Sequence, residues 1–168
     1  MLVFALLFCS YLSARRVDGP QIFRAGQGEL VQSHGAINTL LLLVSSLLVV
    51  TAVRALRNGL AGLAPKLFAL AFCCGLGFAF VKMLEYANAI GHGFVPTTNN
   101  FWMYFYVLTG LHFFHLLIGM GFLVYCFTKS RYPDQMSRQQ FSLVEGAACF
   151  WHMVDLLWIV LFALLYLA

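Results

Sequence analysis

Two histidines, His112 and His115, stand three residues apart in NNFWMYFYVLTGLHFFHLLIG, a stretch apolar enough to cross a bilayer. Neighbouring imidazoles on one helix could ligate a metal ion or a haem if further His, Cys or carboxylate ligands lie at a matching depth. They could equally be neutral rings that are hydrogen-bonded inside a helix bundle. Ionisable groups in a membrane segment usually mark a function, so the other polar residues bear on both interpretations.

A lysine and a glutamate, Lys82 and Glu85, form a second candidate group. They follow a stripe of small residues at four-residue spacing, Ala71, Gly75 and Ala79, which lets helices approach closely. At about 100° per residue, both charges fall within about 80° of Gly75, on the packed side of the helix. Their i,i+3 spacing also permits a mutual ion pair.

The segment EGAACFWHMVDLLW supplies a third group. On a helix, Glu145, His152 and Asp155 share one side, while Trp151 and Trp158 point largely the other way. We therefore expect the polar side of this segment to face the other helices.

The depths of these residues in the membrane suggest which of them meet. Counting about 1.5 Å per residue puts Lys82, His115 and Asp155 about 20 Å from one membrane face, His152 about 15 Å and Glu145 only about 5 Å. A Lys82–Asp155 pair, or a bridge through His115, would lower the cost of isolated charges in hydrocarbon. The predicted buried polar network consists of Lys82, Glu85, His112, His115, Glu145, His152 and Asp155.

Helix-packing positions are predicted from small or polar residues inside the apolar segments. These positions are Asn38, Ala71, Gly75, Ala79 and Gly119. The polar side chains of Asn38, Thr39, Ser45 and Ser46 are expected to bond to neighbouring helices or to their own backbone. No residue of the chain is predicted to be catalytic, to bind a cofactor or to ligate a metal.

The composition is that of an integral membrane protein. Of 168 residues, 62% are hydrophobic and only 10% are charged, whereas a soluble domain is about a quarter charged. No polar stretch is long enough to bury a core of its own, so residues 1–168 are predicted to form a single domain. The net charge of +4 lies mainly between the apolar segments, which indicates orientation rather than nucleic-acid binding. The five cysteines lack a C-x-x-C spacing and indicate neither a disulfide framework nor a zinc site.

Five apolar segments predict an all-α, polytopic bundle of five transmembrane helices. The segments span residues 1–14, 34–56, 66–90, 101–128 and 142–168. The first would reach only about 21 Å against a hydrocarbon core of roughly 30 Å, so we interpret it as a truncated first helix. A misplaced start codon or a lost N-terminal segment would explain it.

The basic residues predict the orientation. The second and fourth connections carry six of them, Arg54, Arg57, Lys66, Lys129, Arg131 and Arg138, against three in the first and none in the third. By the positive-inside rule, the second and fourth connections are cytoplasmic. The N-terminus is then cytoplasmic and the C-terminus periplasmic.

Four motifs carry a resemblance to a known family. They are NTLLLLVSS, Glu85–Tyr86, TGLHFFHLLIG and E-x5-WHMVDLLW, in this order along most of the chain. In these motifs the sequence resembles subunit III of the haem-copper oxidases (cytochrome c oxidase subunit III). The five-helix length and the compact connection PTTNNFWMYFYVLTG resemble the short branch associated with nitric oxide reductase. Family members usually carry an acidic residue just before the position matching Met1, and that residue is the candidate for a proton-related role. It is absent from this sequence, so the role is assigned to no residue here.

The resemblance implies an accessory role in the inner (plasma) membrane of a bacterium. Such a subunit holds no cofactor itself; haem and copper or iron belong to the catalytic large subunit of the oxidase or nitric oxide reductase. It packs against that subunit, binds phospholipid and supports proton uptake, assembly and durability in electron transport. The expected partners are therefore the large subunit and membrane lipids, without nucleic acid.

Two other functions remain open from the residues alone. A stand-alone membrane metal or haem protein would use His112, His115 and His152 with nearby carboxylates. A small proton-coupled transporter would use Lys82, Glu85 and Asp155, although the chain lacks the internal repeat that many transporters show.

Overall fold

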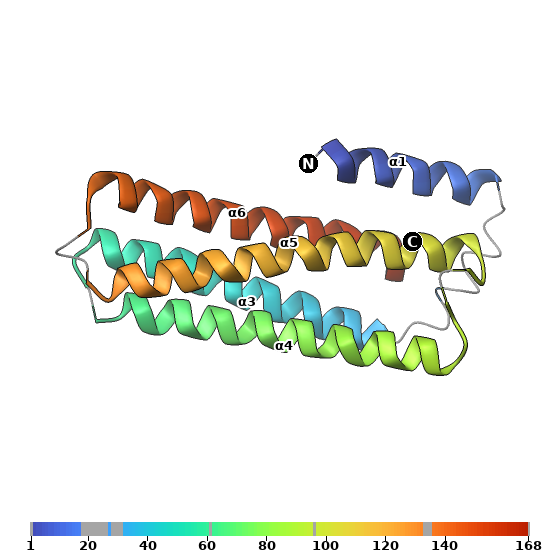
Figure 1. Ribbon diagram of the computed structural model, residues 1–168, viewed down its shortest axis with the longest axis horizontal. Helices are drawn as coiled ribbons and strands as arrows, with labels where there is room; N and C mark the ends of the chain where they lie inside the picture. The colour runs from blue at the N-terminus through green and yellow to red at the C-terminus, as the bar shows by residue number, and fades with distance from the viewer. Residues whose placement is uncertain are drawn as a thin grey trace.

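The computed structural model describes residues 2–17, 27, 32–60, 62–95, 97–132 and 136–167, and these are helical with short connections and without strands. The elements are α1 (Leu2–Val17), α3 (Gln32–Arg57), α4 (Ala64–Gly91), α5 (Asn100–Ser130) and α6 (Arg138–Phe162), which continues as a π-helix, η2 (Ala163–Leu167) (Figure 1). The predicted all-α fold is confirmed.

Among the described residues, four stretches of helix are long and apolar enough to cross a membrane: α3, α4, α5 and the continuous run from Arg138 to Leu167. The chain is therefore a multi-pass membrane protein. The helix α1 has 16 residues and spans about 24 Å, less than the roughly 30 Å of a hydrocarbon core. That α1 is a fifth membrane helix, and that the N-terminus is cytoplasmic, stay predictions.

The helix ends differ from the predicted segments because local caps determine them. The last long helix begins at Arg138 rather than at 142, since Ser137 and Gln140 form a capping box. The helix α5 begins after Asn99, whose side chain accepts a hydrogen bond from the Trp102 backbone N–H. Gly93 ends α4 in a left-handed conformation (φ 79°), with the paired backbone hydrogen bonds of a Schellman motif.

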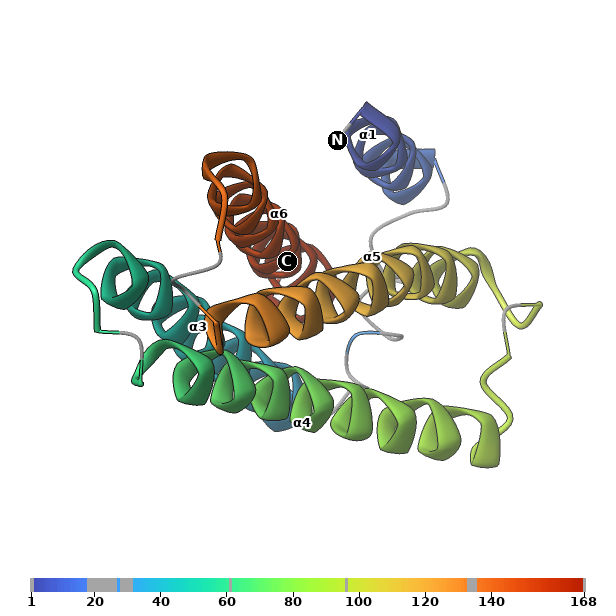
Figure 2. The same ribbon diagram turned by 60° about the vertical axis from the view of Figure 1, so that its left-hand side comes forward.

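The four long helices form one bundle, and α1 lies outside it. The helix α3 packs against α4 and α6, α5 packs against the same two helices, and α1 contacts α5 (Figures 1 and 2). The α3–α4 and α5–α6 connections lie at one end of the bundle, at the left of Figure 1. This end, called here the α3–α4 end, carries the six basic residues on which the predicted orientation depends.

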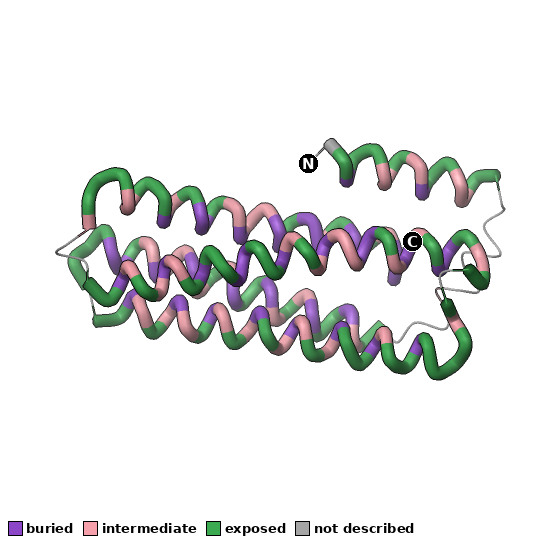
Figure 3. The backbone as a smooth tube through the Cα atoms, in the orientation of Figure 1, coloured by how far each residue is buried: buried purple, intermediate pink, exposed green. Residues whose placement is uncertain are grey.

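The centre of the bundle is built around the indole of Trp151, which is 1% exposed. Two glycines make room for it. A Cβ atom on Gly75 of α4 would lie 3.1 Å from the Trp151 ring, and one on Gly119 of α5 only 2.8 Å away. The small residues of these helices therefore allow a large aromatic ring to pack between the backbones. Buried positions accordingly lie along the inward sides of the helices in Figure 3.

The tryptophans contradict the orientation predicted for the last helix. Trp151 and Trp158 were expected to point away from the packed side, yet both are almost completely buried. Since lipid is as apolar as an aromatic ring, packing rather than hydrophobicity decides which side of a membrane helix turns inward. Large rings that fit against glycines take the centre of the interface, and Glu145 and His152 lie at its edge, partly exposed.

Candidate functional site

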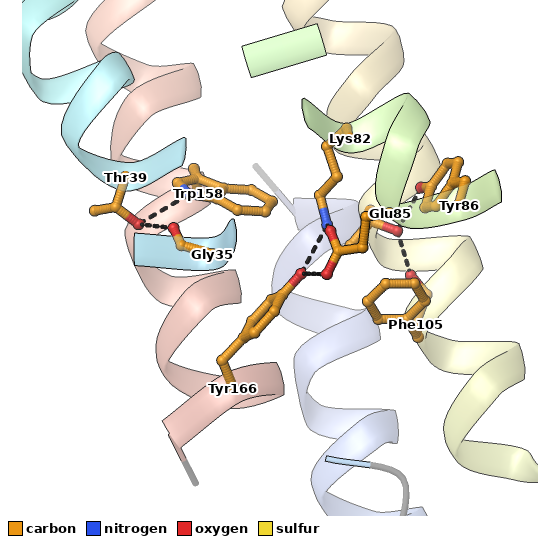
Figure 4. Close-up of polar contacts among 9 residues, drawn as sticks. Gly35, Thr39, Lys82, Glu85, Tyr86, Phe105, Trp158 and Tyr166 are labelled. Atoms are coloured by element: carbon orange, nitrogen blue, oxygen red, sulfur yellow. Dashed lines mark hydrogen bonds and ion pairs between the residues drawn. The ribbon is translucent and has the colours of Figure 1, made fainter. Parts of the chain in front are cut away.

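A charged cluster lies inside the bundle at the end away from the α3–α4 connection. Lys82 Nζ of α4 donates hydrogen bonds to Glu85 Oε2 at 2.7 Å and to the Tyr166 hydroxyl at 2.9 Å. That hydroxyl donates in turn to Glu85 Oε1 at 2.5 Å. Figure 4 shows the three side chains converging from α4 and η2, and we call them the Lys82 cluster.

Aromatic rings enclose the ammonium group of this cluster. Lys82 Nζ lies 4.8 Å from the centroid of a Trp158 ring, 5.0 Å from that of Phe105 and 5.8 Å from that of Tyr86. Lys82 is only 2% exposed and Glu85 5% exposed. Cation–π attraction and the ion pair together offset the cost of removing both charges from water.

The partners of Lys82 differ from those suggested by depth. Its carboxylate partner is Glu85, as the i,i+3 spacing allows, and the depth-based Lys82–Asp155 pair is not formed. The second partner, Tyr166, was missed. It lies in a five-residue π-helix, whose wider turn changes the direction of the side chains that follow, and a regular 3.6-residue periodicity does not reveal such a turn.

The two histidines of α5 occupy different surroundings from those predicted. His112 is fully buried, and neither ring nitrogen has a hydrogen-bond partner among the described residues. Its ring centroid lies 5.7 Å from that of Phe78 and 5.3 Å from that of Trp158. His115 Nδ1 lies 2.9 Å from the Leu111 carbonyl oxygen. The hydrogen-bonded network expected around both rings is not formed around His112, because aromatic rings occupy its flanks.

Polar residues of α3 pair with the tryptophans of α6. Ser45 Oγ donates to the Ala71 carbonyl oxygen and accepts from Trp151 Nε1, both at 3.1 Å. Trp158 Nε1 donates to Thr39 Oγ1, also at 3.1 Å. These contacts match the bonding expected for the serines and threonine. Asn38 differs, since its amide is fully buried without a hydrogen-bond partner in the part of the chain that the structure describes.

A second polar group, called here the His152 site, consists of His152, Ser46 and Asp155. The Ser46 hydroxyl lies 2.5 Å from His152 Nδ1. Asp155 is 5% exposed and interacts with both Ser46 and His152. Its Oδ1 atom has no hydrogen-bond partner among the residues described. Unlike the Lys82 cluster, this site has unused hydrogen-bonding capacity.

An open cleft of about 320 Å³ between α3 and α6 leads to this site. Arg54, Arg57 and Glu145 line it, with Cys149 and His152 deeper along α6. Arg57 and Glu145 form an ion pair near its mouth, where their side chains are 60% and 35% exposed. Glu145 thus has the partner at the membrane boundary that its shallow depth suggested, and it is not buried with the other charges.

The residues predicted to form one buried polar network therefore lie in separate parts of the bundle. Lys82 and Glu85 lie together, His152 and Asp155 lie together, and the two histidines of α5 join neither hydrogen-bonded group. Within the described residues, no group of three or more His, Cys, Asp or Glu side chains is arranged to hold a metal ion. The geometry offers a neutralised, enclosed ion pair and an accessible, incompletely paired histidine and carboxylate.

Comparison with known proteins gives a consistent result over the whole chain. A family model described as cytochrome c oxidase subunit III matches residues 2–168. Cytochrome c oxidase subunit 3 of Synechocystis sp. is 36% identical over 165 residues, which cover 98% of this chain and 69% of that protein. The protein of the same name from Thermostichus vulcanus is 32% identical, with 99% and 80% covered. Cytochrome bo(3) ubiquinol oxidase subunit 3 of Pseudomonas putida is 30% identical, with 99% and 79% covered.

Proposed function

This chain belongs to the cytochrome c oxidase subunit III family, and from that premise we propose that it is a non-catalytic subunit of a bacterial respiratory haem-copper oxidase. Its partner is the large subunit, which carries haem and copper and reduces oxygen. The complex lies in the inner (plasma) membrane. The relatives from Synechocystis sp. and Pseudomonas putida, both named as oxidase subunits, support this assignment.

The observation that carries the accessory role is the pairing inside the Lys82 cluster. Lys82, Glu85 and Tyr166 bond to one another, and aromatic rings enclose the ammonium group. Such an arrangement balances the two charges inside the bundle and encloses them, which stabilises the packing of the helices. The chain accordingly contributes assembly and durability to the complex rather than a reaction centre.

Phospholipid is a further proposed ligand. A groove of about 720 Å³ lies between α5 and α6, with Ile118, Phe122, Leu143 and Phe150 among the residues that line it. Its walls are almost wholly apolar, and an acyl chain fits such a surface in a bilayer. Native mass spectrometry of the complex in mild detergent should detect the bound lipid.

The nitric oxide reductase branch suggested by the short sequence stays a prediction. The oxygen-reducing and nitric oxide-reducing partners are distinguished by measuring consumption of both gases by the purified complex. If the complex consumed nitric oxide rapidly and no oxygen, the partner would be a nitric oxide reductase rather than an oxidase.

Affinity purification tests the accessory role. A tagged copy of the chain, extracted in mild detergent, should bring down a haem-bearing large subunit in equal amount. After separation from its partner, the chain itself should show no Soret band and no stoichiometric metal. Migration of the chain alone, or haem bound to the isolated chain, would refute the proposal.

A further inference from the structure

The cleft between α3 and α6 differs in chemistry from the two apolar grooves, the one between α5 and α6 and the one at Cys73. Its mouth carries Arg54, Arg57 and Glu145, whereas the groove at Cys73 is lined entirely by apolar residues. His152 lies seven positions after Glu145, so the cleft extends about 10 Å along α6. Its volume of about 320 Å³ admits several water molecules, each of which occupies about 30 Å³.

One ionisable group, His152, lies at the deep end of the cleft, and a second, Asp155, is buried behind it one helical turn further along α6. His152 lines the cleft, and its Nδ1 atom is engaged by Ser46. Asp155, three residues further along α6, is 95% buried, with Oδ1 unpaired among the described residues. An unpaired buried carboxylate oxygen costs free energy unless a proton or a donor reaches it.

The charges around His152 come from both helices that form the cleft. Arg54 and Arg57 of α3 disfavour a positive imidazolium, while Glu145 and Asp155 of α6 favour it. Arg57 and Glu145 are paired with each other at the mouth, which largely cancels their effect. Burial of the ring disfavours the imidazolium, and the charge of Asp155, one turn further along α6, favours it.

We propose that this cleft admits water from the α3–α4 end of the bundle and that His152, with Ser46 and Asp155, forms a proton-binding site at its floor. In the tautomer whose Nδ1–H donates to the Ser46 hydroxyl, Nε2 has the free lone pair. Hydronium in the cleft gives its proton to this Nε2 atom, which makes the ring an imidazolium and leaves a water molecule. The Asp155 carboxylate balances the imidazolium charge. This proposal depends on the proposed function in one respect, that the chain lies in a respiratory membrane. It adds the residues at which this subunit takes up a proton.

Cys149, an exposed thiol that lines the cleft, reports whether the cleft is wet. The test uses two variants of the full chain in permeabilised native membranes, one retaining only Cys149 and the other only Cys73. Cys73 is also exposed but lies in the apolar groove, which makes it a matched control. A water-soluble methanethiosulfonate should modify Cys149 at least about tenfold faster, because the reacting thiolate forms only in water. Equal, slow modification of both thiols would show that lipid fills the cleft and would overturn the proposal.

Proton binding is read from the pH dependence of the same reaction. Cys149 and His152 are three residues apart on one helix face, so a positive imidazolium stabilises the Cys149 thiolate. The modification rate should show an inflection in the acidic range besides that of the thiol, and His152→Gln should remove it. Asp155→Asn should move this inflection to lower pH, since the balancing charge is lost. A profile unchanged in both variants would refute proton binding at His152.

These measurements are independent of the partner. If the chain purifies without a large subunit while Cys149 still reacts rapidly, the proposed function fails and the wet cleft stands. If the complex is isolated but Cys149 is unreactive and the profile has one inflection, the proton site fails and the accessory role stands.

Discussion

The Lys82 cluster and the His152 site place similar groups, a base beside a carboxylate, in opposite surroundings. In the first, the ammonium donates to Glu85 and Tyr166 and is enclosed by aromatic rings. In the second, a cleft reaches His152, and a carboxylate oxygen of Asp155 has no partner in the described part of the chain. Burial with a bonded counter-ion makes an ionic group structural, whereas an accessible group with an unpaired neighbour is able to titrate.

The largest expected effect comes from breaking the enclosed pair. Glu85→Gln leaves the Lys82 ammonium without a counter-ion inside the bundle, and loss of one partner of a buried pair costs about 3 to 5 kcal/mol. The variant should unfold at much lower denaturant concentration, or fail to accumulate in the membrane. Unfolding monitored by tryptophan fluorescence in mixed detergent micelles measures the change.

The matched control removes both charges. Lys82→Met combined with Glu85→Gln leaves no isolated charge, so it should recover much of the lost stability. If the double variant were as unstable as Glu85→Gln alone, an uncompensated charge would not be the cause, and the enclosed character of the cluster would be in doubt.

Trp151 and His152 are adjacent in sequence, but Trp151 is buried and His152 lies beside the cleft. A substitution at Gly119 tests the packing of the buried Trp151 ring. A Cβ atom on Gly119 would lie 2.8 Å from the Trp151 indole, which is also held by Ser45. Gly119→Ala should therefore destabilise the bundle by about 1 to 3 kcal/mol, the usual cost of overpacking. Thermal unfolding of the purified chain measures this loss.

Gly121 supplies the control on the same helix, since a Cβ atom there would meet nothing within 4 Å. Gly121→Ala should be neutral or stabilising. We also expect the modification rate of Cys149 to be unchanged in folded Gly119→Ala protein, because the cleft lies between α3 and α6. A loss of stability in Gly121→Ala equal to that in Gly119→Ala would contradict the packing role of the indole.

Several features could be predicted from the sequence because they depend on local spacing. Lys82 and Glu85 lie one helical turn apart on α4, so their ion pair follows from helix geometry alone. The stripe containing Gly75 likewise indicated close packing, although the ring that fills it, Trp151, comes from a helix distant in sequence. The spacing of residues within one helix thus predicted which face of the helix is packed, but not which residue of another helix packs against it.

Other features depend on how the helices meet, which a single sequence does not determine. The inward rotation of Trp151 and Trp158 follows from their fit and their bonds to α3, and it places His152 at the edge of the interface. Tyr166, which accepts a hydrogen bond from Lys82, lies in the π-helix that continues α6, where a regular helical periodicity does not predict the direction of the side chain. Equal depth along two helices predicted a Lys82–Asp155 contact that the rotation of α6 does not permit.

Two adjacent serines of α3 compare the dry and open surroundings most directly. Ser45 is fully buried, where it bonds to the Ala71 carbonyl oxygen and to Trp151 Nε1. Ser46 is only partly buried and contacts His152 beside the cleft. Ser45→Ala leaves a buried indole N–H unpaired, at a cost of about 1 to 3 kcal/mol. Ser46→Ala should cost less than about 1 kcal/mol, since water in the cleft can replace the hydroxyl.

The difference between the two alanine variants is therefore the quantity to measure, by unfolding in the same detergent and at the same pH. Both substitutions remove one hydroxyl from the same helix, so the change in helix propensity cancels between them. Ser46→Ala should also alter the acidic inflection in Cys149 modification, whereas folded Ser45→Ala protein should retain it. Equal losses of stability would mean that the His152 site is as dry as the centre of the bundle, and the distinction between the two polar sites would fail.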